Sequence, residues 1–250
     1  MMADQQKTFI GVRILLGLTL LLLILVFMGG PGVHLGIWTP IDGFRLSFVG
    51  GYMGGLFLAG LSVVVMIIVA MDKKKRGMGK LMLTLCIGLL LAAPLGYLRL
   101  SGGGGIPMIH DITTDTIRPP EFIVLVEKRG EDANSLVYGG EELAAKQAAA
   151  YPDVKPLMVP DEPEAVFNKA LDTARRLGWE IAGVDSAVKR FEATDYSFWF
   201  KFADDIVVIV KPTETGSRID LRSISRAGRS DFGVNAARIL RFQDNFVTTP

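Results

Sequence analysis

The stretch "LLGLTLLLLILVFM", residues 15–28, decides the class of this protein. It ends an almost wholly apolar run over residues 9–28, and similar runs cover residues 48–71 and 81–98. About 20 apolar residues suffice for a helix to cross the roughly 30 Å hydrocarbon layer of a bilayer. A helix also satisfies its own backbone hydrogen bonds in lipid. We therefore predict three transmembrane helices. The first run lacks a signal-peptide cleavage pattern, because "GGPGVHLG" follows it, so we expect it to be retained.

The loops between these runs differ in charge, which predicts the orientation in the membrane. Residues 72–80, "DKKKRGMGK", carry five basic side chains, whereas the only fixed positive charge in residues 29–47 is Arg45. Basic loops remain in the cytoplasm. We expect a multi-pass protein of the bacterial plasma (inner) membrane. Its N-terminus and the 72–80 loop are then cytoplasmic, and its C-terminal part is periplasmic or extracellular. A contact between the lysine-rich loop and anionic lipid fits the same topology.

Composition divides the chain into an anchor, residues 1–100, a glycine-rich joint, residues 101–106, and a domain, residues 107–250. The first 100 residues have a net charge of +6 and the remainder a net charge of −5. An acidic domain does not suit nucleic acid, whose phosphates require a basic face. Cys86 is the only cysteine, which rules out an intramolecular disulfide and a cysteine-based zinc site. We expect no metal and no cofactor.

The second apolar run begins "GGYMGGLFLAG", in which two glycine pairs have the G-x-x-x-G spacing. Small residues at this spacing let helix backbones approach closely. The pattern predicts helix packing, either against the two other spans of the same chain or in an oligomer. The residues concerned are Gly50, Gly51, Gly54 and Gly55.

The domain is predicted to be α+β, with helices packed on one face of an antiparallel sheet. Residues 161–178 predict a helix that Asp161 caps, Pro163 begins and Gly178 ends. Residues 141–150 predict a shorter helix, and residues 233–246 a final one. Residues 155–159 suggest a short strand. Alternating patterns predict five more strands, at residues 179–185, 189–195, 197–202, 205–212 and 217–226. In the last of these, the face with Arg218, Asp220 and Arg222 is expected to meet solvent.

The segment "PMIHDITTDTIRPPEF", residues 107–122, contains the metal-ligand types His110, Asp111 and Asp115. The only other histidine is His34, so a metal or acid–base site needs carboxylates from elsewhere. Asp and Thr also bond to nearby backbone groups, which favours an extended strap against the sheet and a structural His110. We expect Asp111 or Asp115 to pair with Arg226 or Arg229.

The loop "ISRAGRSDFGVN", residues 224–235, precedes the last helix and is the strongest candidate for a binding site. Ser230 or Asp231 can cap that helix, and its first N–H groups with a nearby arginine can hold an anion. A structural cap with an Arg229 salt bridge is the alternative. The candidate ligand- or partner-binding residues are Arg226, Arg229, Ser230, Asp231 and Asn235 of this loop, together with His110, Asp111 and Asp115 of the strap.

Several motifs together resemble the bacterial domain-of-unknown-function family 1499, over roughly residues 107–248. They are "HDITTD", "AAAYPD", "LGWEI", "FEATD" and, most specifically, "SRIDLRSISRAGRSDFGVNAARI". Members of this family are often membrane-anchored or exported. The resemblance implies a single domain but no activity, cofactor or catalytic residue.

These observations predict a non-enzymatic membrane protein whose external domain binds an envelope component, a membrane complex or a lipid-like ligand. One alternative is an envelope hydrolase or transferase that uses His110 and nearby carboxylates. Another is a structural subunit that oligomerises through the second span. The sequence contains no Ser/His/Asp order, nucleotide-binding glycine fingerprint or phosphate loop.

Overall fold

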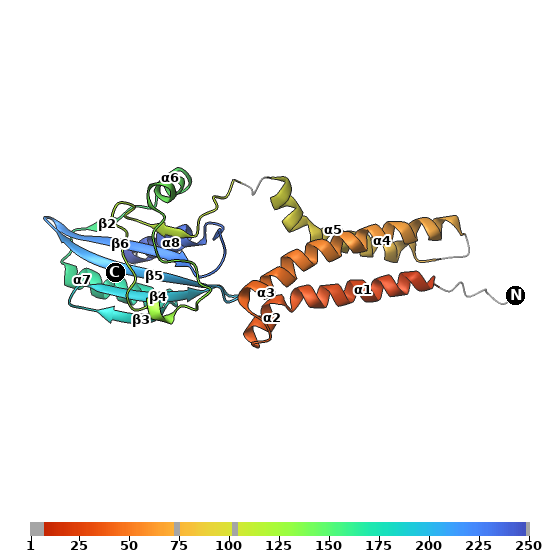
Figure 1. Ribbon diagram of the computed structural model, residues 1–250, viewed down its shortest axis with the longest axis horizontal. Helices are drawn as coiled ribbons and strands as arrows, with labels where there is room; N and C mark the ends of the chain where they lie inside the picture. Colours follow the sequence, from red (N-terminus) through yellow and green to blue (C-terminus); the bar gives the residue numbers. More distant parts are fainter. Residues whose placement is uncertain (1–7, 73–75, 102–104, 249–250) are drawn as a thin grey trace. The chain divides into compact units, whose positions relative to one another are not determined.

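The computed structural model describes residues 8–72, 76–101 and 105–248 (Figure 1). Residues 102–104 of the predicted joint and residues 73–75 of the basic loop therefore lie outside the described residues. The chain divides into two compact units, one of residues 1–105 with Trp199–Lys201 and one of Ile106–Phe198 with Phe202–Pro250. Each unit has its own buried apolar cluster, so each is described by itself.

The first unit contains three helices that are long and apolar enough to cross a membrane, as predicted. They are α1 (Ile10–Phe27), the helix Pro40–Met71 and α5 (Met78–Leu100). The second begins earlier than expected, because Thr39 caps the short helix α3 (Pro40–Arg45). A π-helical turn, Leu46–Gly50, then joins α3 to α4 (Gly51–Met71). The helix α2 (Gly29–His34) follows α1.

Three of the four glycines named at the start of the second span pack against other helices of this unit. A Cβ atom on Gly55 would lie 2.4 Å from the carbonyl oxygen of Gly88 in α5, so only glycine permits this approach. Gly51 also faces α5, and Gly54 faces Leu22 of α1. A Cβ on Gly50 would contact only its own helix. The G-x-x-x-G spacing therefore serves packing between helices of one chain.

The second unit contains an antiparallel six-stranded sheet of order β1-β6-β5-β4-β3, with β2 also paired to β6 (Figure 1). The strands are β1 (Asp111–Thr113), β2 (Leu157–Val159), β3 (Glu180–Asp185), β4 (Arg190–Tyr196), β5 (Ala203–Thr213) and β6 (Gly216–Ser225). Residues 197–202 do not form the predicted strand. They connect β4 to β5, because Ser197 N–H donates to the carbonyl of Phe202 and Lys201 adopts a positive φ of 54°.

Helices α7 (Pro163–Arg176) and α8 (Val234–Thr248) cover one face of this sheet, which confirms the predicted α+β architecture. Phe167 of α7 and Phe242 of α8 are buried with Phe191 of β4 in the main core. Helix α6 (Gly140–Ala150) lies against β1, where the Gln147 side chain bonds both the N–H and the carbonyl of Thr113.

The start of α7 differs in detail from the prediction. Glu162, not Asp161, occupies the N-cap position, and no side chain caps the helix. Pro163 begins the helix because its fixed φ suits the first turn. Gly178 ends the helix segment with a φ of 83°, as expected of a glycine there.

The opposite face of the sheet is covered by an irregular segment, residues 119–138, which includes the 3-10 turn Val126–Lys128. Phe122 and Leu125 of this segment pack on Val207 and Ile224 of the sheet. The expectation that the charged face of β6 meets solvent is therefore wrong. Arg222 is buried because this segment covers it and β1 borders β6. Asp220 is also buried, and it is engaged by Thr114, Lys211 and Arg218.

Candidate functional site

The predicted strap is confirmed where β1 pairs antiparallel with β6, opposing Asp111 to Ile224. Asp111 and Arg222 project from the same face, because Arg222 lies two residues from Ile224. The Arg222 guanidinium binds the Asp111 carboxylate with two bonds, Nε–Oδ1 at 2.9 Å and Nη2–Oδ2 at 2.8 Å. Both side chains are buried. A buried bidentate pair of this kind is strong and geometrically specific.

Arg222 also holds the covering segment in place. Its guanidinium donates to the carbonyl oxygens of Pro120 at 3.2 Å and Leu136 at 2.8 Å. It lies 5.4 Å from the ring centre of Phe122 and 5.5 Å from that of Tyr138. Burial first, and then the charge of Asp111, raises the pKa of Tyr138 to about 12. One arginine thus ties β1, β6 and both ends of this segment together.

The expected partners of the strap carboxylates were wrong. Asp115 pairs with Arg218 at 2.8 Å, not with Arg226 or Arg229. Asp205 opposes Ile224 across β5 and β6, so Arg226, two residues after Ile224, is its diagonal neighbour. Arg226 binds the Asp205 carboxylate at 2.8 Å. Arg229 lies in an exposed loop, and its side chain has no ion pair within the described part of the chain. Register decides these pairings, and single-sequence patterns do not reveal register.

Burial tends to raise the pKa of Asp115, but backbone N–H donors outweigh it. Asp115 Oδ1 accepts the N–H groups of Arg118 at 2.9 Å and Ile117 at 3.1 Å. With the charge of Arg218 added, the pKa of Asp115 falls below its ordinary value. These bonds form the local turn predicted for an aspartate in the strap.

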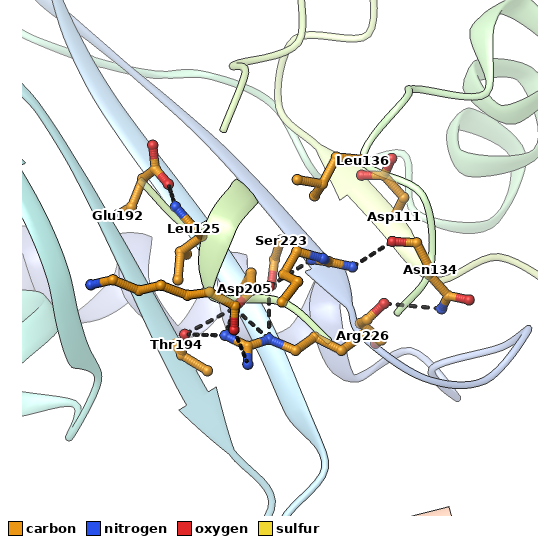
Figure 2. Close-up of polar contacts among 12 residues, drawn as sticks. Asp111, Leu125, Asn134, Leu136, Glu192, Thr194, Asp205, Ser223 and Arg226 are labelled. Atoms are coloured by element: carbon orange, nitrogen blue, oxygen red, sulfur yellow. Dashed lines mark hydrogen bonds and ion pairs between the residues drawn. The ribbon is translucent and has the colours of Figure 1, made fainter. Parts of the chain in front are cut away.

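Two further carboxylates, Glu192 and Asp205, are buried on this face and were not predicted as site residues. The Glu192 carboxylate accepts the N–H groups of Ile123 at 2.7 Å, Val124 at 3.1 Å and Leu125 at 2.8 Å. Asp205 accepts bonds from Thr194 at 2.9 Å and from the guanidinium groups of Arg129 and Arg226. Figure 2 shows Glu192 directed at Leu125, and Asp205 between Thr194 and Arg226. The only signal in the sequence for these two carboxylates was that charged residues recur at alternate positions of the predicted strands, which places them on one face of the sheet.

The polar residues of the loop 224–235 have structural partners. Asp231 is buried and accepts the N–H groups of Gly233 and Asn235, both at 2.8 Å. Ser230 Oγ donates to the carbonyl of Pro107 at 3.0 Å, and the Asn235 amide donates to that of His110 at 3.0 Å. These contacts hold the strap to the start of α8. Arg229 takes no part in these contacts and is exposed at the surface.

Two hollows open on either side of residues 134–139. The smaller, of roughly 340 Å³, is lined by His110, Asp111, Asn134, Glu142 and Lys146, among others. The larger, of roughly 710 Å³, is lined by Arg118, Phe122, Tyr138 and Arg222, among others. Val137 borders both hollows. The Asp111–Arg222 pair contributes one member to each, so it lies between them.

The smaller hollow unites His110 with two carboxylates, but both have partners. Both oxygens of Asp111 are bound by Arg222, and Glu142 binds Lys146 at 2.6 Å. Both carboxylates of this hollow are therefore engaged by a cation, and the hydrogen bond and charge of Lys146 hold the pKa of Glu142 below its ordinary value. Within the residues that the structure describes, no three His, Cys, Asp or Glu side chains group closely enough to hold a metal ion.

Comparison with known families gives a match over residues 111–246, which is more than half of the chain. The matching family is described as "Protein of unknown function (DUF1499)". The match begins at the aspartate of the buried ion pair and ends within α8, so it covers the sheet and its helices. No curated protein matches the sequence.

Proposed function

This chain belongs to the DUF1499 family, whose function is unknown, and we propose that its membrane-anchored domain is a non-catalytic binding module. The proposed ligand or partner is a component of the bacterial envelope: a protein, a membrane complex or a lipid-like molecule. The two hollows beside residues 134–139 form the proposed binding surface.

The observation that carries this proposal is the internal pairing of the charged groups. Asp111, Glu142 and Arg222 line the hollows, and each is engaged by another residue of the domain. Acid–base catalysis requires a group with an exchangeable proton within reach of the substrate. Recognition requires instead a stable surface with apolar area and a few oriented polar groups.

The rim of the larger hollow supplies such apolar area. Ile117 is 88% exposed and Val137 is 83% exposed, and both border this hollow. Pro119, the Phe122 ring and Leu136 extend the apolar lining, while Arg118 and Glu121 add charges. Exposed apolar groups around a hollow are typical of sites that bind a partner or ligand.

A photo-crosslinking amino acid at Val137 tests this proposal in native membranes. We expect a defined adduct with a protein or lipid after illumination. Val188 is the matched control, because it is also an exposed valine and lies in the turn between β3 and β4. Equal crosslinking patterns at the two positions would contradict a binding surface at the hollows.

We further propose that the domain lies outside the cytoplasm. The basis is the charge difference between the loop 72–80 and residues 29–47. A phosphatase that is active only outside the cytoplasm, fused after Pro250, should be active. Activity only of a cytoplasmic reporter at this position would reverse the assignment.

An envelope hydrolase or transferase is the second candidate, because His110 shares a hollow with Asp111 and Glu142. This candidate predicts that His110→Ala abolishes function in cells while the domain remains folded. The binding proposal predicts that the same variant retains function. Assembly through the second span has weaker support, since Gly51, Gly54 and Gly55 pack against helices of the same chain.

A further inference from the structure

The exposed aromatic side chains of the domain gather at one end of its sheet. Within the described residues 106–198 and 202–248, the aromatic residues classed as exposed are Tyr196, Phe198 and Phe232. The other aromatic residues of these segments are buried or partly buried. Single exposed apolar residues are common, but three aromatic residues at one end are a feature to explain.

The strand register shows that these residues share an end. Tyr196 is the last residue of β4 and opposes Ala203 at the start of β5. The N–H of Arg226, just after β6, donates to the carbonyl of Ala203 at 3.0 Å. The loop that carries Phe232 therefore begins beside the connection that carries Phe198. We call this part the aromatic end; it is defined by Tyr196, Phe198, Arg229 and Phe232.

The backbone at Phe232 is strained. Its φ is 55°, in the left-handed region that costs a non-glycine residue roughly 1–2 kcal/mol. The bonds from Gly233 and Asn235 to the Asp231 carboxylate fix the backbone on both sides of it. Such strain persists only where the surroundings enforce it, and it is concentrated at functional positions. Here it holds a phenylalanine at the surface with 54% of its area exposed.

The loop of Phe232 and the strap bound to it carry further exposed groups. Val234 is 47% exposed and Met108 is 63% exposed. Met108 belongs to the strap, whose neighbouring Pro107 carbonyl accepts the Ser230 hydroxyl. Arg229 is exposed in the same loop, and no hydrogen bond or ion pair engages its guanidinium among the described residues. The loop thus presents an aromatic ring, aliphatic groups and one available cation together.

We propose that the aromatic end is a membrane-contact surface that rests on a lipid bilayer. The amphipathic tyrosine ring prefers the headgroup region, and phenylalanine side chains insert their apolar rings at the boundary between headgroups and acyl chains. A guanidinium forms charge-assisted hydrogen bonds with lipid phosphate. The three apolar helices anchor the protein in a membrane, so a bilayer is available to the domain. None of the four residues that define this surface lines the two hollows, and the surface borders the smaller hollow at Met108.

Lipid-borne quenching of a fluorescent label tests the contact in the full chain. Replacing Cys86 by Ala removes the only native thiol, so one introduced cysteine is labelled selectively. The label is compared at Phe232→Cys and Val188→Cys, two positions that are both 54% exposed. Val188 lies in the turn before Arg190, at the opposite end of β4 from Tyr196. The protein is reconstituted in vesicles of phosphatidylethanolamine and phosphatidylglycerol that contain a lipid with a spin-labelled headgroup.

We expect quenching by the spin-labelled lipid to be several-fold greater at position 232 than at position 188. A water-soluble quencher such as iodide should show the reverse order. Equal lipid quenching at both positions would overturn the proposal. So would protection of position 232 from iodide without lipid quenching, because that result indicates a protein partner at this surface.

A second variant keeps the test independent of the label at Phe232. Phe232→Gly removes the ring while suiting the left-handed backbone, so the fold is retained. With the label at Val234→Cys, this variant should lose at least half of the lipid quenching. Arg229→Gln should weaken the quenching more in vesicles with phosphatidylglycerol than in vesicles of neutral lipid. Unchanged quenching in both variants would refute the assigned roles of the ring and the guanidinium.

Discussion

Replacing Arg222 by methionine should destabilise the domain more than any exposed arginine substitution. The change leaves the Asp111 carboxylate, which is 4% exposed, without its two charge-assisted bonds. It also removes the donor to the carbonyl oxygens of Pro120 and Leu136. Breaking one side of a buried ion pair costs about 3–5 kcal/mol. Domains have a total stability of roughly 5–15 kcal/mol, so this loss is a large fraction.

Urea unfolding of the full chain in detergent, followed by brief proteolysis at each urea concentration, measures this effect. With a urea dependence of about 2 kcal/mol per molar, the midpoint should fall by roughly 2 M. Arg229→Met is the matched control, because Arg229 is exposed and should change the free energy of unfolding by less than about 0.5 kcal/mol.

The double variant Asp111→Asn with Arg222→Met separates the ion pair from the other contacts of Arg222. Removing both charges should restore part of the lost stability, because no unpaired buried charge remains. The remaining deficit reports the bonds to the two carbonyl oxygens. If Arg222→Met unfolds at the same urea concentration as Arg229→Met, the assignment of Arg222 as the central contact of this face is refuted.

Three further predictions concern other parts of the chain. Gly55→Ile should disrupt packing between α4 and α5 and lower the yield of folded protein in detergent, whereas Gly60→Ile should not, because a Cβ at Gly60 meets no atom within 4 Å. Asp115→Asn should lower the free energy of unfolding of the domain at neutral pH, and this difference from wild type should disappear as the pH falls through the lowered pKa of Asp115. The reason is that a carboxylate with a depressed pKa stabilises the fold only while it is ionised. An equal difference at all pH values would contradict the ionised pairing. Phe232→Gly should raise the free energy of unfolding by up to about 1 kcal/mol through relief of the positive φ, and a decrease in a urea titration would show that the ring supports the fold.

The helices and most strands could be predicted from the sequence, because they follow from the length and periodicity of apolar runs along the chain. Three apolar runs long enough for a bilayer predicted three spanning helices. The change from helical to alternating period near Trp179 predicted the sheet after α7, with helices on one face. The strand predicted at residues 197–202 was wrong, because aromatic residues favour strands by composition whereas Lys201 and the Ser197–Phe202 bond form a turn.

Tertiary structure alone decided which charged groups meet. The sequence placed Asp111 and Asp115 in a strap and predicted arginine partners, but the partners proved to be Arg222 and Arg218. A shift of one residue in register moves every side chain to the other face of a sheet, so local patterns cannot select the partner. Burial of the charged face likewise depended on residues 119–138, which are distant from β6 in the sequence. The Glu192 carboxylate holds this segment by accepting the backbone N–H groups of Ile123 and Leu125. The sequence by itself determined where apolar helices and strands form, because these follow short-range periodicity, and only the folded sheet decided which carboxylate each guanidinium neutralises.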